Sequence, residues 1–182
     1  MTQFTPPSAS PEAAELPDAA RRVSGILQTL GHSGTVVMLP ESGRTSAQAA
    51  SGLGCEVAQI AKSIIFRRLA DDVPVLVIAS GANRVDEIKV AAQVGPIGKA
   101  NAQYVRDKTG YAIGGVAPLA HASPPVTLID ADLLALESLW AAAGHPHAVF
   151  ELTPQQLVAL TGAPVVDIAE RVEHASATPL QP

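Results

Sequence analysis

A lysine within an apolar segment and a glycine-rich loop are the features of this sequence best suited to chemistry. Lys62 lies in the segment QIAKSIIF, whose aliphatic residues place its ammonium group in a partly apolar setting. The loop Gly110–Pro118 contains Gly114 and Gly115, and glycine lets successive backbone N–H groups approach an oxygen atom that carries negative charge. Pro118 is expected to stiffen this loop. A lysine that only extends its amine from a sheet edge into solvent would give the same local pattern.

Two histidines and one cysteine are further candidates. His145 and His147, in the segment GHPH, could position a water molecule, and a purely structural role agrees with the sequence equally well. A zinc site through both is disfavoured because no second pair of ligands lies nearby in the sequence and Cys55 is the single cysteine. Cys55 is interpreted as a small packing residue rather than a nucleophile. We expect no metal ion and no cofactor.

The sequence lacks the common motifs of nucleotide binding and serine hydrolysis. Gly98-Lys99 has neither the earlier glycine nor the following Ser or Thr of a mononucleotide-binding loop. No Gly-x-Gly-x-x-Gly and no Gly-x-Ser-x-Gly occurs. An ordinary small-ester hydrolase is therefore disfavoured, because no activated nucleophile can be identified.

Composition and charge restrict the class of protein. Of the 182 residues, 47% are hydrophobic and 3% aromatic, which allows one domain with an aliphatic core. The net charge of −5 argues against a general nucleic-acid binder. The span 62–108 holds eight basic and five acidic residues, either a local patch that faces phosphate groups or an ordinary solvated surface. No apolar run reaches the ~20 residues that span a bilayer, and no signal peptide is recognisable, so we expect a cytoplasmic protein without membrane contact.

Helical and extended segments alternate along the chain. The periodicity and capping residues predict helices over 18–30, from 45 to about 52, over 85–94 and 101–109, and from 153 onward. Extended segments are expected over 35–39, 59–69, 74–79, 126–130, 148–152 and 165–168. The turn 70–72 makes a hairpin of the second and third of these segments, with Lys62 on its first strand. Asp18, Thr45 with Gln48, Asn101 and Thr153 are the expected N-caps.

This pattern predicts a single mixed α/β domain of the α+β type. Hairpin connections require antiparallel strand pairs, which excludes a doubly wound parallel sheet. The domain is expected to span residues 18–175. Residues 1–17 and 176–182 are rich in Pro, Ser and Ala, and we expect them to be flexible tails.

Lys62 followed by Gly114-Gly115-x-x-Pro118, in this order and spacing, resembles the YbaK / prolyl-tRNA synthetase insertion-domain family of aminoacyl-tRNA deacylases. The resemblance extends over about residues 44–171. It also includes the Ala-rich helix before the lysine strand and the strand ends at Asp130 and Asp167. It implies a mixed, mostly antiparallel, curved or barrel-like sheet flanked by helices.

The resemblance implies trans-editing hydrolysis of a misacylated tRNA, most simply tRNA for proline that carries a small wrong amino acid. An aminoacyl ester is already activated, so stabilisation of charge on its carbonyl oxygen by N–H groups of the loop 114–118 would suffice for much of the catalysis. The implied catalytic residues are Lys62, Gly114, Gly115 and Pro118, and the implied substrate-binding residues are Ser63, Tyr111, Asp130, His145 and His147. The partner is the aminoacylated acceptor end, with extra affinity borrowed from prolyl-tRNA synthetase or an elongation factor.

Several alternatives stay open at this point. Lys62 can contact the phosphate of the terminal adenosine, or the amino end of the substrate through water. Tyr104 and Tyr111 can stack on adenine or pack in the core. The same fold can also serve as a non-catalytic module that binds a nucleotide, nucleic acid or partner protein. The amino acid removed (Ala, Cys, Ser, Thr or an analogue) and the oligomeric state are not fixed by the sequence.

Overall fold

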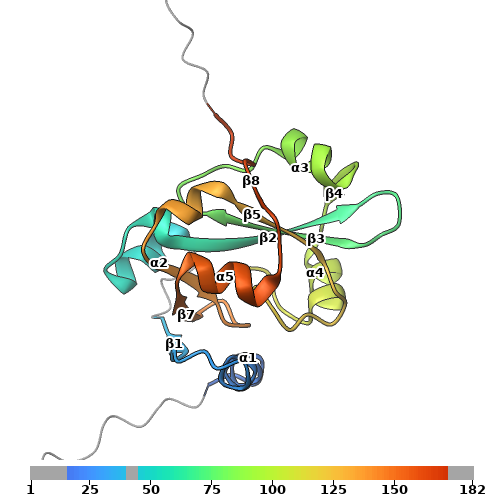
Figure 1. Cartoon of the computed structure of the whole chain (residues 1–182). Helices are drawn as coiled ribbons and strands as arrows, with labels where there is room; N and C mark the ends of the chain where they lie inside the picture. The colour runs from blue at the N-terminus through green and yellow to red at the C-terminus, as the bar shows by residue number, and fades with distance from the viewer. Residues whose placement is uncertain (1–15, 40–44, 172–182) are drawn as a thin grey trace, which may run out of the picture.

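The computed structural model describes residues 16–39 and 45–171, which form one mixed sheet with helices around it (Figure 1). Its α-helices are α1 (Asp18–Thr29), α2 (Ser46–Leu53), α3 (Glu87–Val94), α4 (Ala102–Thr109) and α5 (Pro154–Thr161). Its strands are β1 (Val37–Met38), β2 (Ile60–Arg68), β3 (Pro74–Ser80), β4 (Ile97–Lys99), β5 (Val126–Asp130), β6 (Leu139–Ala142), β7 (Ala148–Leu152) and β8 (Val165–Val166). Short 3-10 helices, Val57–Gln59 and Ala131–Ala135, precede β2 and follow β5.

The sheet has the order β1-β7-β6-β2-β3-β5-β8, and β4 pairs with β2 outside this path. β2 and β3 form the predicted antiparallel hairpin, in which Arg67 pairs with Pro74 next to the turn. β2 is also antiparallel to β4 but parallel to β6, and β3 is parallel to β5. The predicted mixed α+β architecture in a single domain is confirmed.

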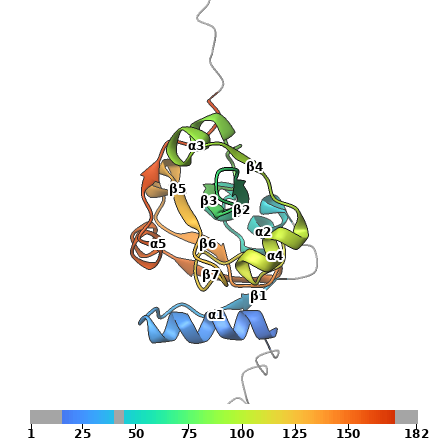
Figure 2. The same cartoon turned by 90° about the vertical axis from the view of Figure 1, so that its right-hand side faces the viewer.

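β3 is the centre of the core, and all of its residues are buried. Leu76 and Ile78 belong to the main cluster, which also holds buried residues of α1 and α5. Val75 and Val77 belong to a second cluster, together with Val90 of α3. Because alternate residues of a strand point to opposite faces, a strand buried throughout needs cover on both sides. Figure 2 shows α1 and α3 on opposite sides of the sheet.

The helix starts follow the capping residues in most cases. Thr45 with Gln48 and Thr153 with Gln156 form complete capping boxes at α2 and α5. Asn101 caps α4 as predicted, by accepting a hydrogen bond from the N–H of Tyr104. The prediction for α1 was wrong, because Pro17 holds the N-cap position. Asp18 is instead the first residue of that helix.

The sequence did not predict β4 and β6. Both are short. β4 pairs with β2, and β6 lies between β7 and β2, whose paired residues are about 80 positions earlier in the chain. Short strands of this kind depend on distant neighbours more than on their own sequence. The predicted tails lie outside the described residues except for Leu16 and Pro17, and Leu16 packs against the main core. Within the described part of the chain, no helix is long and apolar enough to cross a membrane.

Candidate functional site

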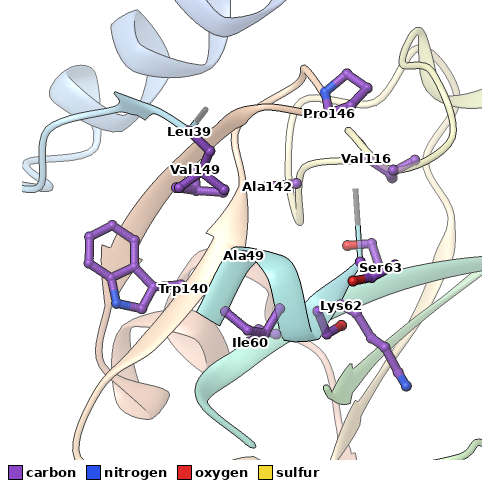
Figure 3. Close-up of a pocket in the computed structure, with 14 residues that line it drawn as sticks. Leu39, Ala49, Ile60, Lys62, Ser63, Val116, Trp140, Ala142, Pro146 and Val149 are labelled. Carbon is purple, nitrogen blue, oxygen red and sulfur yellow. The ribbon is translucent and has the colours of Figure 1, made fainter. Parts of the chain in front are cut away.

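A small pocket of about 120 Å³ lies where β2, β6 and β7 approach α2 and the glycine-rich loop (Figure 3). Its lining comprises Leu39, Thr45, Ser46, Ala49, Ile60, Ala61, Lys62, Ser63, Gly114, Val116, Trp140, Ala142, Pro146 and Val149. Much of the wall is a hydrophobic cluster that contains Ile60, Val149 and the partly buried Trp140. The pocket is therefore mainly apolar. Lys62 and Ser63 are consecutive residues of β2, so their side chains point to opposite faces of that strand (Figure 3).

The predicted site residues divide into two groups in the structure. Lys62, Ser63 and Gly114 line the pocket, so segments that lie about 50 residues apart in the sequence meet there. The other predicted residues do not line it: Gly115, Pro118, Tyr111, Asp130, His145 and His147. Pro118 is buried. The hydroxyl oxygen of Ser63 is buried, and no described residue forms a hydrogen bond with it.

Lys62 is half-buried and its ammonium group is directed away from the apolar wall. In Figure 3 the side chain runs away from Trp140 and Val149. Its Nζ donates a 2.5 Å hydrogen bond to the backbone carbonyl oxygen of Asn83, in the loop after β3. Burial lowers the pKa of Lys62, and the negative charge of Asp130 offsets part of that effect.

Asp130, expected to bind substrate, lies behind Lys62 and is fully buried. Its carboxylate accepts hydrogen bonds from the N–H of Ser80 (3.2 Å), the side-chain amide of Asn83 (2.8 Å) and the N–H of Asp132 (3.1 Å). These three donors supply the hydrogen bonds that a buried carboxylate requires. A side chain with no exposed surface does not contact a ligand in the pocket, so the expectation of direct substrate binding is corrected.

The glycine-rich loop uses its two glycines differently. Gly114 lies at the pocket with a φ of +85°, a conformation that other residues adopt at a cost. The N–H of Gly115 is already occupied, because it donates a 2.9 Å hydrogen bond to the carbonyl oxygen of Ala112. Among the described residues, none accepts a hydrogen bond from the N–H of Gly114 or Val116. The available donors therefore lie on these two residues, not on Gly115 as the sequence suggested.

The GHPH turn packs directly on this loop. A Cβ atom on Gly115 would lie 2.6 Å from the carbonyl carbon of His145, so only glycine fits there. His145 accepts a hydrogen bond from the N–H of His147 at its Nδ1 (3.2 Å), and the two rings meet edge to face. Pro146 lines the pocket, whereas neither histidine does. The turn contributes its proline to the site.

Tyr111, expected to bind substrate, is a core residue of the same loop. Its side chain is 1% exposed, which leaves no face for stacking on a base. The hydroxyl group donates to the carbonyl oxygens of Leu119 and Ala120, both at 3.0 Å. The guanidinium of Arg22, on α1, lies 5.1 Å from the centre of the ring. Tyr111 therefore holds the ends of the loop together.

Comparison with known proteins places this geometry in a family. The family model of the aminoacyl-tRNA editing domain matches residues 40–160, about two thirds of the chain. The chain belongs to the aminoacyl-tRNA editing domain family. This result confirms the resemblance that the lysine and the glycine–proline loop indicated.

Individual relatives agree with the family. A crystal structure of a proposed trans-editing enzyme for prolyl-tRNA synthetase is 45% identical, with a TM-score of 0.81 over 86% of this chain and 100% of that chain. The crystal structure of the protein APE2540 is 30% identical, with a TM-score of 0.75 over 82% of this chain and 99% of that one. The protein YwhH of Bacillus subtilis (strain 168) is 33% identical over 117 residues, 64% of this chain and 74% of YwhH.

Several residues of this editing domain's pocket escaped the sequence analysis. Trp140 was missed because β6 was not predicted, although it is the single tryptophan of the chain. Val116 and Pro146 were passed over within motifs whose glycines and histidines drew attention. Asn83 carries no sequence signal for its contact with Lys62, because the contact uses a backbone oxygen.

The basic residues between 62 and 108 are partly neutralised by neighbouring carboxylates on the surface of the editing domain. Most of them are engaged with carboxylates: Arg67 and Lys108 with Asp72, Arg68 with Asp71, Arg84 with Glu170, and Lys89 with Asp167. In the described ranges, no group of three His, Cys, Asp or Glu residues could hold a metal ion.

Proposed function

We propose that the protein is a trans-editing enzyme that hydrolyses the ester of a misacylated tRNA, with tRNA for proline as its substrate. The main support for this proposal is the pocket, where Lys62, Ser63 and Gly114 meet in a chain of the aminoacyl-tRNA editing family. The similarity to a proposed trans-editing enzyme for prolyl-tRNA synthetase, at 45% identity over nearly all of the fold, supports this choice of tRNA.

Charge stabilisation by the loop is the proposed source of catalysis. Water attacks the ester carbonyl carbon, the carbonyl oxygen becomes negative, and the ribose oxygen leaves and takes up a proton. The N–H groups of Gly114 and Val116 border the pocket without a described acceptor, so they are the donors we assign to that oxygen. Gly115 and Pro118 set the shape of the loop.

We assign Lys62 and Ser63, on β2, to substrate binding, at the side of the pocket away from the glycine-rich loop. The Lys62 ammonium group attracts the phosphate of the terminal adenosine, since its side chain leads away from the apolar wall. Ser63 lines the pocket, and no described residue forms a hydrogen bond with its hydroxyl group, so a rotation of this side chain would let the hydroxyl bind the aminoacyl group. Both assignments require the ester to lie between β2 and Gly114.

The size of the pocket sets the proposed selectivity. A volume of about 120 Å³ with walls from Trp140, Val149 and Ile60 suits a small side chain such as that of alanine, serine or cysteine. We expect proline on its own tRNA to escape hydrolysis, because the pocket is too small or wrongly shaped for its ring. The acceptor end is the main contact, and a synthetase or elongation factor would supply the remaining affinity.

The experiment is a deacylation panel. tRNA for proline is charged separately with Ala, Cys, Ser, Thr or Pro and incubated with catalytic amounts of the protein. We expect multiple turnovers with at least one small wrong amino acid and protection of prolyl-tRNA. Binding without turnover on every substrate would instead support the non-catalytic binding module.

A further inference from the structure

The loop after β3 contains a hydrogen-bonded frame that ends at Lys62. The Asn83 carbonyl oxygen accepts the bond from the Lys62 ammonium group, while the Asn83 side chain lies between two carboxylates. Its amide nitrogen donates to Oδ2 of Asp130 at 2.8 Å and to Oδ2 of Asp132 at 2.7 Å. Both N–H groups of the amide are thus used, which fixes the orientation of this residue.

One end of the frame is rigid because it is buried. Asp130 ends β5 and has no exposed surface, and it also binds the N–H of Ser80 at the end of β3. The backbone N–H of Asn83 in turn donates to the Ser80 carbonyl oxygen at 3.0 Å. The core therefore holds the turn that presents the acceptor to Lys62.

The other end of the frame reaches a segment near the C-terminal end of the described chain. Arg171 binds Asp132 through two hydrogen bonds of 2.9 Å and also contacts Asp167 at 3.0 Å. Lys89 of α3 fastens the same segment, by donating to the Asp167 carboxylate at 2.8 Å and the Ala169 carbonyl oxygen at 2.9 Å. Paired guanidinium–carboxylate bonds of this geometry are the stronger kind of ion pair. The segment lies beyond residues 40–160, the range that matches the family model.

We propose that Asn83 is a positioning residue for Lys62, and that Asp130 together with the Asp132–Arg171 pair holds Asn83 in place. The effect on catalysis rests on the proposed deacylase function, whereas the effect on the Lys62 ammonium group does not. Asn83 does not line the pocket, so it acts through Lys62 alone.

The electrostatic surroundings of Lys62 agree with this arrangement. Asp130 is the charged group on the described elements whose field acts on the ammonium group. The neighbouring strand positions, Ala79 opposite on β3 and Ala141 opposite the preceding residue on β6, carry no charge. Burial lowers the pKa of Lys62, so the Asn83 oxygen and the Asp130 charge both favour the charged form against that tendency.

A double-mutant cycle separates a positioning role from a general structural one. Asn83→Ala is expected to reduce deacylation about tenfold. In Lys62→Ala it should cause no further loss, because its effect passes through Lys62. Multiplied losses in the double variant would overturn the proposal. Arg171→Ala, an exposed change that leaves the core intact, should reduce the rate severalfold. Arg84→Ala, which removes the ion pair with Glu170 on the same segment, is the matched control and should leave it unchanged.

NMR titration of isotope-labelled lysine tests the same proposal without enzymatic activity. We expect the pKa of Lys62 to fall by about one unit in Asn83→Ala, because the turn loses its side-chain bonds to Asp130 and Asp132 and no longer holds its backbone oxygen against the ammonium group. The pKa should stay constant in Arg84→Ala. An unchanged Lys62 titration in a folded Asn83→Ala protein would contradict the proposal even if the wild type deacylates. A shifted titration in a protein with no deacylase activity would support the positioning of Lys62 and refute the proposed function.

Discussion

Gly115 lies against His145 so closely that a Cβ atom on the glycine would be 2.6 Å from the histidine carbonyl carbon. Two motifs that the sequence offers as separate candidates, the glycine-rich loop and the GHPH turn, are therefore one packed unit. This contact aligns Gly114 and Pro146 at the pocket, where the Cβ position of Gly114 would be 3.7 Å from the Pro146 Cβ. The glycine is required for close packing, and the two residues proposed to donate to the ester oxygen, Gly114 and Val116, lie on either side of it.

Gly114→Val is expected to reduce deacylation about a hundredfold, the size typical for losing one oxyanion donor. The new side chain strains a backbone at φ +85° and projects into the pocket, while little of the core is disturbed. The circular dichroism spectrum should stay native. Gly162→Val is the matched control, because it carries a similar strain at φ +61° with open space around it and lies outside the pocket. Equal losses of activity in both variants would show that the loop acts only through stability.

Tyr111→Phe is expected to lower the free energy of unfolding by about 1–2 kcal/mol, since the buried Leu119 and partly buried Ala120 carbonyl oxygens lose the one O–H donor they share while the ring packing is kept. Burial raises the pKa of this hydroxyl group, so it remains a donor across the neutral range. Denaturant unfolding gives the measurement. Tyr104→Phe is the control, because its hydroxyl donates to a single carbonyl oxygen, that of Asp72, at a partly buried site. A loss no greater for Tyr111 than for Tyr104 would contradict its role in closing the loop.

Features that depend on residues close together in the sequence were predicted correctly. The capping box of Thr45 and the tight turn of the β2–β3 hairpin depend on residues within a few positions, and both are confirmed. Trp140 and Asn83 show the limit, because one lies on a short strand held between β2 and β7 and the other acts through a backbone oxygen. Asp130 was predicted to bind substrate, whereas its burial depends on three donors that only the folded chain brings together.

The pH dependence of deacylation should show an alkaline limb below the pKa of about 10.4 that a free lysine side chain has. Burial lowers the pKa of Lys62, so the charged form and the activity are lost as the pH rises through that lowered value. Unfolding does not explain the limb. The folded-state pKa is the lower one, so deprotonation of Lys62 removes a cost to folding as the pH rises. Rates are corrected for spontaneous ester hydrolysis, and Lys62→Arg should move the limb to higher pH. A limb that stays in place in this variant would assign it to another group.

Exhaustive chelation should leave deacylation unchanged, because backbone N–H groups polarise the ester in the proposed mechanism. The rival zinc site through His145 and His147 predicts the opposite result, with loss of activity and about one metal ion per chain. Its geometry is unfavourable, since Nδ1 of His145 already accepts the N–H of His147. Activity that disappears with the chelator and returns with zinc would overturn the mechanism.

The most direct test of the central claim is the deacylation rate of Lys62→Ala on the misacylated tRNA that the wild type hydrolyses fastest. The proposed mechanism predicts a folded protein with a deacylation rate at least tenfold lower, about 1.4 kcal/mol of lost transition-state stabilisation. The pocket would then be the site of hydrolysis, with Lys62 as one of its functional residues. A rate equal to that of the wild type would contradict the proposed mechanism, since it would place the hydrolysis elsewhere on the molecule.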